Sequence, residues 1–316
     1  MNDRTGYAML FASDLIGVEI SPHGVTCALT GGSPASPRVE RVSHTPFSPQ
    51  TLQISLREQN ILDPDAFVAG LKSAYNLLLC NSPRVAVSLP DATCRIMLLD
   101  LEGRFKSRTE ALDLIRWKLK KSIPLDSADT YIDYQQLAVR ENGDLALLVA
   151  IASHTVISQY EDLITQAGLS PARIDCNVFN ICHTFDRRLS LHDGCILISF
   201  YGNTLSIVAF SQGIPEFIRS KYLPGTLATD SRVYMELISS LLVYKERFPE
   251  RPEQSVFCVA SPDVAQNFLG MVAEATGVTP VLLETKGAVI PGNSAPGDQV
   301  RLFSCTAAIG AALRSL

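Results

Sequence analysis

Two tight turns in the chain contain residues that could approach an anion. The first is Ser21-Pro22-His23-Gly24, between the apolar runs Gly17–Ile20 and Val25–Leu29, and the second is Tyr201-Gly202-Asn203. Backbone N–H groups come close to a phosphate only where the neighbouring side chains are small, as glycine allows. Each turn predicts the tip of a β-hairpin, and two such tips beside a common cleft would suit a nucleotide.

Other reactive residue types do not form a recognisable centre. The eight cysteines include no Cys-x-x-Cys pair, and most lie in apolar runs such as Phe257-Cys258-Val259, so we expect small buried hydrophobic residues. The five histidines are dispersed, and Cys182-His183 is an isolated pair, so no metal site is predicted. The sequence has neither a Gly-x-Ser-x-Gly elbow nor a Walker-type loop, and we predict no catalytic residue.

The elements around the two turns follow the same order twice. In each half we expect a hairpin, then a helix, then a short buried strand, which is typical of an α/β layer. We expect a loop or irregular hairpin over 31–50. The other predicted elements of the two halves are a helix from Asp63-Pro64, strands at Val85–Pro90, Cys195–Phe200, Thr204–Phe210 and Ser255–Ala260, and helices at Asp230–Arg247, Val264–Thr276 and Arg301–Arg314.

Between the halves, the sequence predicts a smaller α+β insert. Ser107-Arg108-Thr109-Glu110 has the pattern of a capping box at the start of a helix, which Pro124 would end. Strands over Tyr131–Val139 and Leu145–Ala152 flank the turn signal Asn142-Gly143. A further helix after Ser153 and a strand at Ile174–Val178 complete the predicted insert.

Composition and charge limit the class of protein. The chain has 316 residues, 47% of them hydrophobic, and a net charge of −5, which argues against a dedicated nucleic-acid-binding protein. The run Ala8–Ala12 is too short for a signal sequence, and no apolar run reaches membrane-spanning length. We therefore expect a cytoplasmic protein that reaches a membrane only through a partner.

The order of these segments resembles the PilM family, which consists of actin-like, FtsA-related proteins of type IV pilus assembly. The resemblance covers about residues 14–314. The segments that carry it are Ile16–Ser21, Leu112–Leu119, Ile123-Pro124-Leu125, Asp133-Tyr134-Gln135, Glu236–Tyr244 and Ala307–Arg314.

The resemblance implies an α/β, actin-like (ASKHA) fold of two lobes, with an FtsA-type 1C insert and a reduced 2B subdomain. We assign 1–92 to subdomain 1A, 93–178 to the insert 1C, 179–300 to the second half and 301–316 to a C-terminal helix that returns to 1A. The 2B subdomain is predicted to be reduced because only Tyr222–Ser231 separates a strand from the long helix that follows.

The resemblance also places a nucleotide site between the lobes, and there the sequence departs from the family pattern. Glu19 replaces an aspartate, Pro22 lacks an N–H donor, and the second hairpin has lost its acidic residue. We expect neither a cofactor nor hydrolysis. The alternative is an actin-like protein that binds or slowly hydrolyses ATP with Mg²⁺. The remnant nucleotide loops comprise Glu19, Ser21, Gly24, Gly202, Asn203, Thr204, Ala260 and Ser261.

For partners, the resemblance implies that the N-terminal peptide of a PilN-like inner-membrane protein docks between subdomains 1A and 1C. It further implies a link to pilus motor ATPases, and it leaves self-association open. We select Ile115, Arg116 and Trp117 as partner-binding candidates. A further alternative is the cytoplasmic domain of a type II secretion L-like protein, which we rank lower because such chains continue into a transmembrane helix.

Overall fold

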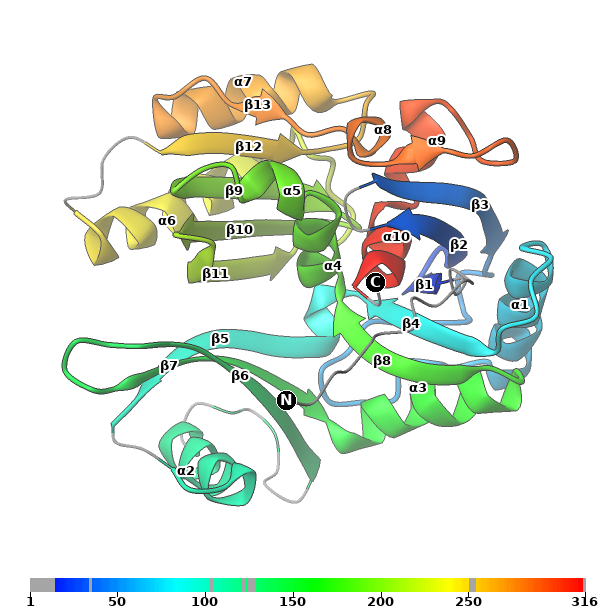
Figure 1. Ribbon diagram of the computed structural model, residues 1–316, viewed down its shortest axis with the longest axis horizontal. Coiled ribbons are helices and arrows are strands. Elements are labelled where there is room, and N and C mark those ends of the chain that lie inside the picture. Colours follow the sequence, from blue (N-terminus) through cyan, green and yellow to red (C-terminus); the bar gives the residue numbers. More distant parts are fainter. Residues whose placement is uncertain are drawn as a thin grey trace, which may run out of the picture.

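We describe the protein from a computed structural model of the chain (Figure 1). The described residues are 15–33, 36–102, 105–120, 123, 125, 129–249 and 254–314. The run Ala8–Ala12, Lys121 and the predicted helix end at Pro124 lie outside them. In the part of the chain that is described, none of the helices combines the length and the apolar sequence needed to cross a membrane.

The first half of the chain forms a six-stranded sheet with helices on both faces. Its elements are β1 (Leu15–Ser21), β2 (Gly24–Ser33), β3 (Ser36–Pro46), β4 (Arg84–Leu89), β8 (Ser170–Cys176), β14 (Ile290–Pro291), α1 (Pro64–Asn76), α3 (His154–Gln166) and α10 (Thr306–Leu313). The strand order is β14-β3-β2-β1-β4-β8, in which β1 pairs antiparallel with β2 and parallel with β4. Apolar side chains of α1 and α3 pack on one face, and α10 covers the other.

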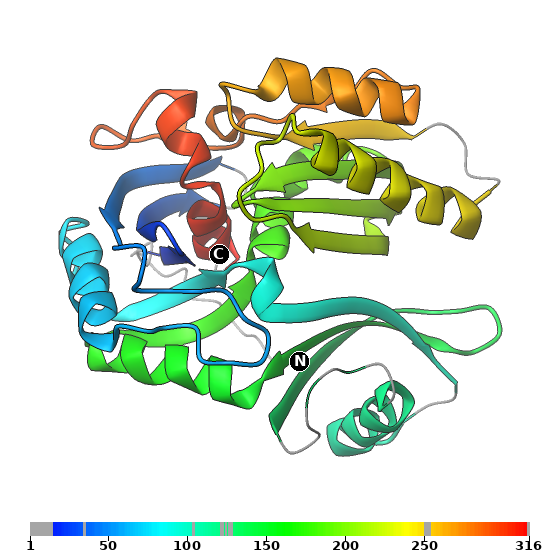
Figure 2. The ribbon, with the colours of Figure 1, turned by 180° about the vertical axis from the view of Figure 1, so that it is seen from behind.

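The second half repeats this arrangement around a five-stranded sheet. Its elements are α4 (Asn177–Thr184), α5 (Asp186–Leu189), β9 (Gly194–Tyr201), β10 (Thr204–Ser211), β11 (Ile214–Tyr222), α6 (Ser231–Arg247), β12 (Ser255–Val259), α7 (Ala265–Thr276) and β13 (Val281–Leu282). Strand β9 pairs antiparallel with β10 and parallel with β12, as β1 does with β2 and β4. Helices α6 and α7 cover one face (Figure 2), and α4 and α5 cover the other. The predicted repeat of two hairpin-led halves is confirmed.

A separate three-stranded sheet projects from the first half (Figure 1). Its elements are β5 (Cys94–Leu101), α2 (Arg108–Leu119), β6 (Thr130–Val139) and β7 (Leu145–Ser153), with the strand order β5-β7-β6. Helix α2 begins as the capping-box pattern predicts, because Ser107 Oγ accepts a hydrogen bond from the backbone N–H of Glu110. Strand β5 was not among the predicted elements.

The insert is shorter than the predicted range 93–178. Helix α3 buries Val156, Tyr160 and Ile164 in the core of the first half, and β8 extends the first sheet by pairing with β4. The boundary at 178 is therefore corrected to the end of β7, because α3 and β8 gain their buried contacts from the first half. At the other end of the chain, β14 has already returned to β3 before residue 301.

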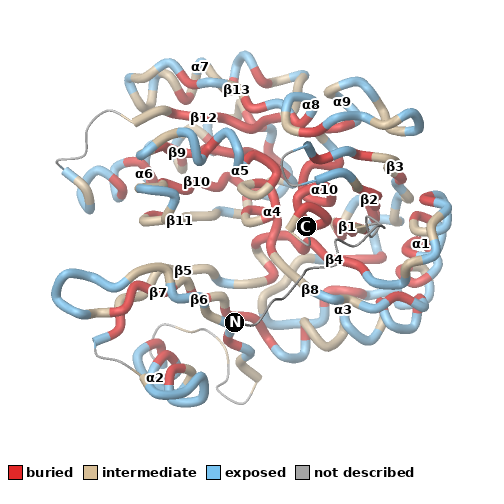
Figure 3. Tube along the Cα trace, viewed as in Figure 1, coloured by how far each residue is buried: buried red, intermediate tan, exposed pale blue. Residues whose placement is uncertain are grey.

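Helices α4 and α10 pack together between the two sheets, and buried residues run through both (Figure 3). Two glycines make this close packing possible. A Cβ atom at Gly17 would overlap the carbonyl oxygen of Ala308, and one at Gly310 would overlap that of Asn180. Larger residues at either position would push α10 away from β1 or from α4.

One further prediction is confirmed in its second form, and another is corrected. The range 31–50, expected to be a loop or an irregular hairpin, contains the end of β2 and all of β3, which pair antiparallel as a hairpin with a register shift after Leu29. The predicted helix Arg301–Arg314 is two helices, α9 (Gln299–Phe303) and α10. Where the start of β5 meets the end of β8, the sulfur atoms of Cys94 and Cys176 lie next to each other. The remaining connections include η1 (Asp91–Thr93) and α8 (Thr285–Ala288).

Candidate functional site

The two halves meet through a buried contact between their hairpins. Glu19 lies near the end of β1, and Tyr201 is the last residue of β9. The phenol Oη of Tyr201 donates a hydrogen bond of 2.7 Å to Oε2 of Glu19, and both residues are buried. The Tyr201 ring also packs against Phe303, which precedes α10. A side chain of the second half therefore occupies the space beside the carboxylate that the sequence analysis assigned to the nucleotide loops.

Burial changes the protonation of this carboxyl group. Desolvation raises the pKa of Glu19 from 4.5 to about 8, although hydrogen bonds from Tyr201 and the backbone of Ala308 oppose the rise. Glu19 is therefore mostly neutral near pH 7. In this state Oε2 of Glu19 accepts the hydrogen bond from the hydroxyl of Tyr201.

The first hairpin tip uses its polar groups internally. The backbone N–H of His23 donates to Ser21 Oγ (3.2 Å), and this hydroxyl in turn donates to the carbonyl oxygen of Gly24. Pro22 has no N–H group. A Cβ atom at Gly24 would overlap backbone atoms of β3, so this glycine permits a close approach between strands. The tip offers few free donors to a phosphate.

The second hairpin and the loop after β12 are likewise engaged within the second half. Gly202 and Asn203 have φ values of 54° and 58°, as a type I′ turn requires. The Asn203 side chain donates to the carbonyl oxygen of Thr226, and Thr204 is buried. Ala260 is buried in the second-half core, and Ser261 donates to the carboxylate of Asp263. Glu19 meets the second half through Tyr201, which was not among the predicted site residues.

Asp91 is a second buried carboxylate that the sequence analysis missed. It accepts hydrogen bonds from the backbone N–H of Val178 (2.8 Å) and from Ser206 Oγ (3.2 Å), so it joins the first half to α4 and β10. Burial raises its pKa to about 6. A proline-aspartate pair directly after a buried strand was the available signal. Among the described residues, no cluster of three or more His, Cys, Asp or Glu side chains is placed to bind a metal ion.

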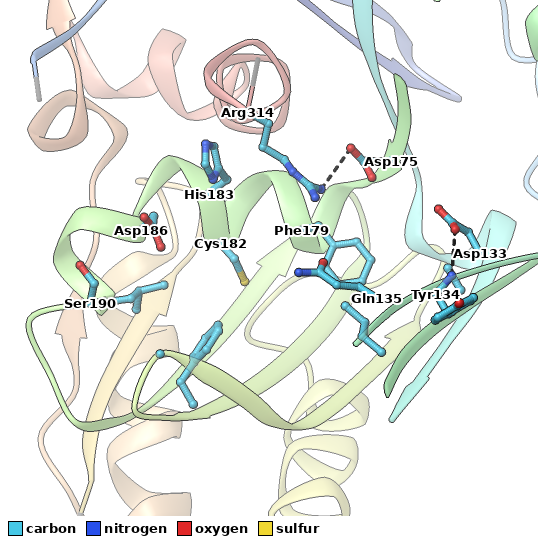
Figure 4. A pocket seen from close by; sticks show the side chains of 15 residues that line it. Asp133, Tyr134, Gln135, Asp175, Phe179, Cys182, His183, Asp186, Ser190 and Arg314 are labelled. Carbon is cyan, nitrogen blue, oxygen red and sulfur yellow. Dashed lines mark hydrogen bonds and ion pairs between the residues drawn. The ribbon is translucent and has the colours of Figure 1, made fainter. Parts of the chain in front are cut away.

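An open groove lies between the insert and the two halves (Figure 4). Its cavity volume is about 350 Å³. One wall is the face of β6 and β7 that points away from α2, and the opposite wall is α4 with the end of β8. The lining residues are Asp133, Tyr134, Gln135, Leu148, Ala150, Asp175, Phe179, Cys182, His183, Asp186, Leu189, Ser190, Phe210, Gly213 and Arg314.

The groove combines apolar walls with charged groups. Asp175 forms an ion pair of 3.1 Å with Arg314, and both side chains remain partly exposed. Partial burial raises the pKa of Asp175, and the two arginines nearby limit the rise. Burial lowers the pKa of His183. Apolar atoms beside a few polar groups, reachable from solvent, are typical of a peptide or ligand site.

The predicted partner-binding residues do not line this groove. Ile115 is fully buried in the insert core, where α2 packs on the strands. Side chains of a strand alternate between the two faces of a sheet, so Leu147 and Val149 point toward α2 while Leu148 and Ala150 point into the groove. Arg116 and Trp117 are exposed on α2, on the far side of the sheet from the groove.

The structure resembles actin-like proteins of known structure. No protein-family model and no curated protein matches the sequence. The chain is similar to one in a PilM–PilN type IV pilus biogenesis complex, with a TM-score of 0.78 and 17% identity over 96% of this chain and 99% of that one.

Two more distant structures share the fold. One is the cytoplasmic domain of EpsL, an inner-membrane component of the type II secretion system of Vibrio cholerae, with a TM-score of 0.54, 10% identity, and coverage of 94% of this chain and 95% of that one. The other is a Bacteroides thetaiotaomicron protein with an actin-like ATPase fold, with a TM-score of 0.50, 11% identity, and coverage of 86% and 90%. The predicted fold is confirmed: this chain has an actin-like fold, similar to that of the chain in the PilM–PilN complex.

Proposed function

We propose that the chain is a PilM-like scaffold of type IV pilus assembly that binds the cytoplasmic N-terminal tail of a PilN-like inner-membrane protein. The observation that carries this proposal is the open groove between the insert and the two halves. The space between the two hairpins, by contrast, is occupied by the side chain of Tyr201. The similar complex contains PilM and PilN. The scaffold would then be cytoplasmic and lie at the inner membrane through this tail.

The walls of the groove suit an extended peptide. β6 is the outermost strand of the insert sheet, and β8 is the outermost strand of the first sheet. Both contribute groove residues, Asp133 and Gln135 from β6 and Asp175 from β8. Edge strands present unpaired backbone groups, which can hydrogen-bond a peptide while apolar pockets take alternate side chains.

We further propose that the nucleotide site is degenerate. A metal-bound triphosphate would have to displace Tyr201 from Glu19 and ionise a carboxyl group whose pKa is about 8. It would also have to replace the internal hydrogen bonds of the first hairpin tip. The link to pilus motor ATPases and self-association stay proposals that follow from the family resemblance, without a surface assigned to either.

Peptide titration tests the groove. Synthetic peptides that copy the N-terminal cytoplasmic tails of PilN-like and type II secretion inner-membrane proteins from the same genome would be titrated calorimetrically. We expect a PilN-like tail to bind, and Ala150→Phe, which fills the groove, to weaken it at least about tenfold. The matched control is Ala138→Phe, at a half-buried alanine of the same sheet outside the groove lining. Equal binding by both variants, or binding of the type II tail alone, would refute this assignment.

A thermal-shift assay with Mg-ATP tests the degenerate nucleotide site. A ligand at about 100 times its Kd adds about 2.7 kcal/mol of stability to the folded state. We expect no change in Tm at millimolar Mg-ATP. A reproducible increase would favour the alternative of an ATP-binding actin-like protein, whatever the result of the peptide titration.

A further inference from the structure

The C-terminal turn of α2 has a positively charged surface with an exposed tryptophan. The described residues 105–120 contain five Lys or Arg and two Asp or Glu, a net charge of +3 in a chain whose total is −5. Trp117, the single tryptophan of the chain, is 77% exposed at this turn. We call Trp117, Lys118 and Lys120, together with the partly exposed Leu114 one turn earlier, the α2 patch.

Packing within the insert does not account for the α2 patch. The core contacts of α2 are made by Ile115 and Leu119, which are buried, while the ring of Trp117 points to solvent. An exposed indole leaves a large apolar surface in water, and tryptophan is among the residues most enriched at binding surfaces. The lysines at the end of α2 also complement the helix dipole, but this explains neither the tryptophan nor the basic residues before the helix.

We propose that the α2 patch binds an anionic lipid surface directly. The sign of the charge fits anionic headgroups, and a tryptophan beside long basic side chains is the combination that lies at the membrane interface, with the indole among the headgroups and the ammonium groups in water. Helix α2, which carries the patch, lies on the side of the insert sheet that faces away from the two halves (Figures 1 and 2).

Acidic residues near the patch cancel part of the positive charge but not that of Lys118 and Lys120. Asp113 is paired with Arg116 at 3.3 Å and Asp133 with Arg108, so these two pairs contribute little net charge. Glu110 accepts a hydrogen bond from the backbone N–H of Lys106 at the start of α2. The Nζ atom of Lys118 donates to the carbonyl oxygen of Asp100, a contact that leaves the ammonium charge uncompensated.

This inference goes beyond the proposed tail binding. A tail in the groove would tether the scaffold, and a second contact through α2 would set its orientation on the bilayer. The two contacts lie on opposite faces of the insert sheet, so both can form at the same time.

The single tryptophan allows a direct test. The full chain, without any tail peptide, is mixed with phosphatidylcholine vesicles that contain or lack about 30% phosphatidylglycerol, and the emission of Trp117 is recorded. We expect a blue shift with anionic vesicles at low ionic strength and its loss at about 0.5 M NaCl, because salt screens exposed charges. No shift with anionic vesicles, or equal shifts with neutral ones, would overturn the proposal.

Two variants of equal net charge distinguish binding through the α2 patch from an effect of the overall charge of the protein. Co-sedimentation would compare Lys118→Glu/Lys120→Glu with Lys72→Glu/Lys245→Glu, which changes net charge equally at exposed residues of α1 and α6. We expect the first variant to bind anionic vesicles at least about 20-fold more weakly and the second to bind nearly as the parent does. Trp117→Ala, which leaves the Lys118 contact intact, should also reduce binding, so the test does not depend on the charge-reversal variant folding normally.

A protein partner is the competing occupant. If vesicles produce no shift but poly-glutamate shifts the Trp117 emission, the lipid proposal is refuted and the patch binds an acidic protein. Tail binding is measured separately by calorimetry, so failure of either proposal leaves the other testable.

Discussion

The two halves contact each other at their hairpins, and the insert and the halves together form a groove. These two regions differ in whether protein side chains fill the space between their walls. At the hairpins, Tyr201 and Glu19 are buried and satisfy each other with a hydrogen bond. In the groove, Asp175 and Arg314 pair but stay partly exposed beside an open cavity. Among the described residues, the Tyr201 side chain occupies the space beside Glu19, while the groove keeps a cavity of about 350 Å³.

The difference shows that fold similarity does not locate function. Actin-like proteins share the two hairpins, but the hairpins here form a structural joint between the halves. A site must be argued from its own geometry and chemistry, since one fold hosts many functions. On that basis the groove is the stronger candidate for binding.

Removing the side chain that fills the hairpin contact should have the largest effect. Tyr201→Ala leaves a cavity and a buried Glu19 without its donor, so we expect it to lower the free energy of unfolding by about 4 kcal/mol. Urea unfolding followed by circular dichroism measures this. The control is Tyr131→Ala on β6, where the side chain is 51% exposed and the expected change is within about 0.5 kcal/mol. If both variants lose a similar amount of unfolding free energy, Tyr201 does not stabilise the contact between the two halves.

The insert offers the same contrast between neighbouring residues of one helix. Ile115 is fully buried and Trp117 is 77% exposed. Ile115→Ala should destabilise the protein by about 3 kcal/mol, and Trp117→Ala should change its stability by less than about 0.5 kcal/mol. Chemical denaturation of both variants checks this, and a large loss for Trp117→Ala would show that its ring packs in the core after all.

The protonation of Glu19 should make the hairpin contact sensitive to pH. Its pKa is 4.5 when exposed and about 8 when folded. Because the folded state holds this proton more tightly, the stabilisation is complete below pH 4.5 and is lost as the pH rises through 8. Between about pH 6 and pH 8.5, the parent should lose about 2 kcal/mol of unfolding free energy relative to Glu19→Gln.

Urea unfolding of parent and variant over this pH range provides the measurement. Asp91, whose pKa is about 6, titrates in both proteins, and because its charge also helps to raise the pKa of Glu19, its contribution cancels only in part. Parallel stability curves would mean that Glu19 is ionised throughout, and the case against a nucleotide-bound cation at this position would weaken.

Local patterns in the sequence determined much of the fold. The capping residues Asp63 and Ser107 begin helices as predicted, because each side chain accepts a hydrogen bond from the first turn. Gly277 ends α7 in the left-handed conformation. The turn residues of both hairpins and the alternation of apolar residues fixed the two-half repeat, since these signals act over a few residues and need no tertiary information.

Only the tertiary structure decided which surfaces are filled and which are open. Periodicity indicated that α3 and β8 exist, but their packing on the first half depends on contacts with residues far away in the chain, such as the hydrogen bond between Asn60 and Tyr160, which are 100 positions apart. Likewise, Tyr201 and Glu19 are 182 residues apart, and no local pattern predicts that one side chain will reach the other or that burial will raise the pKa of Glu19. Burial depends on everything that surrounds a residue, so the sequence determined the elements, and their packing decided which polar groups remain available for binding.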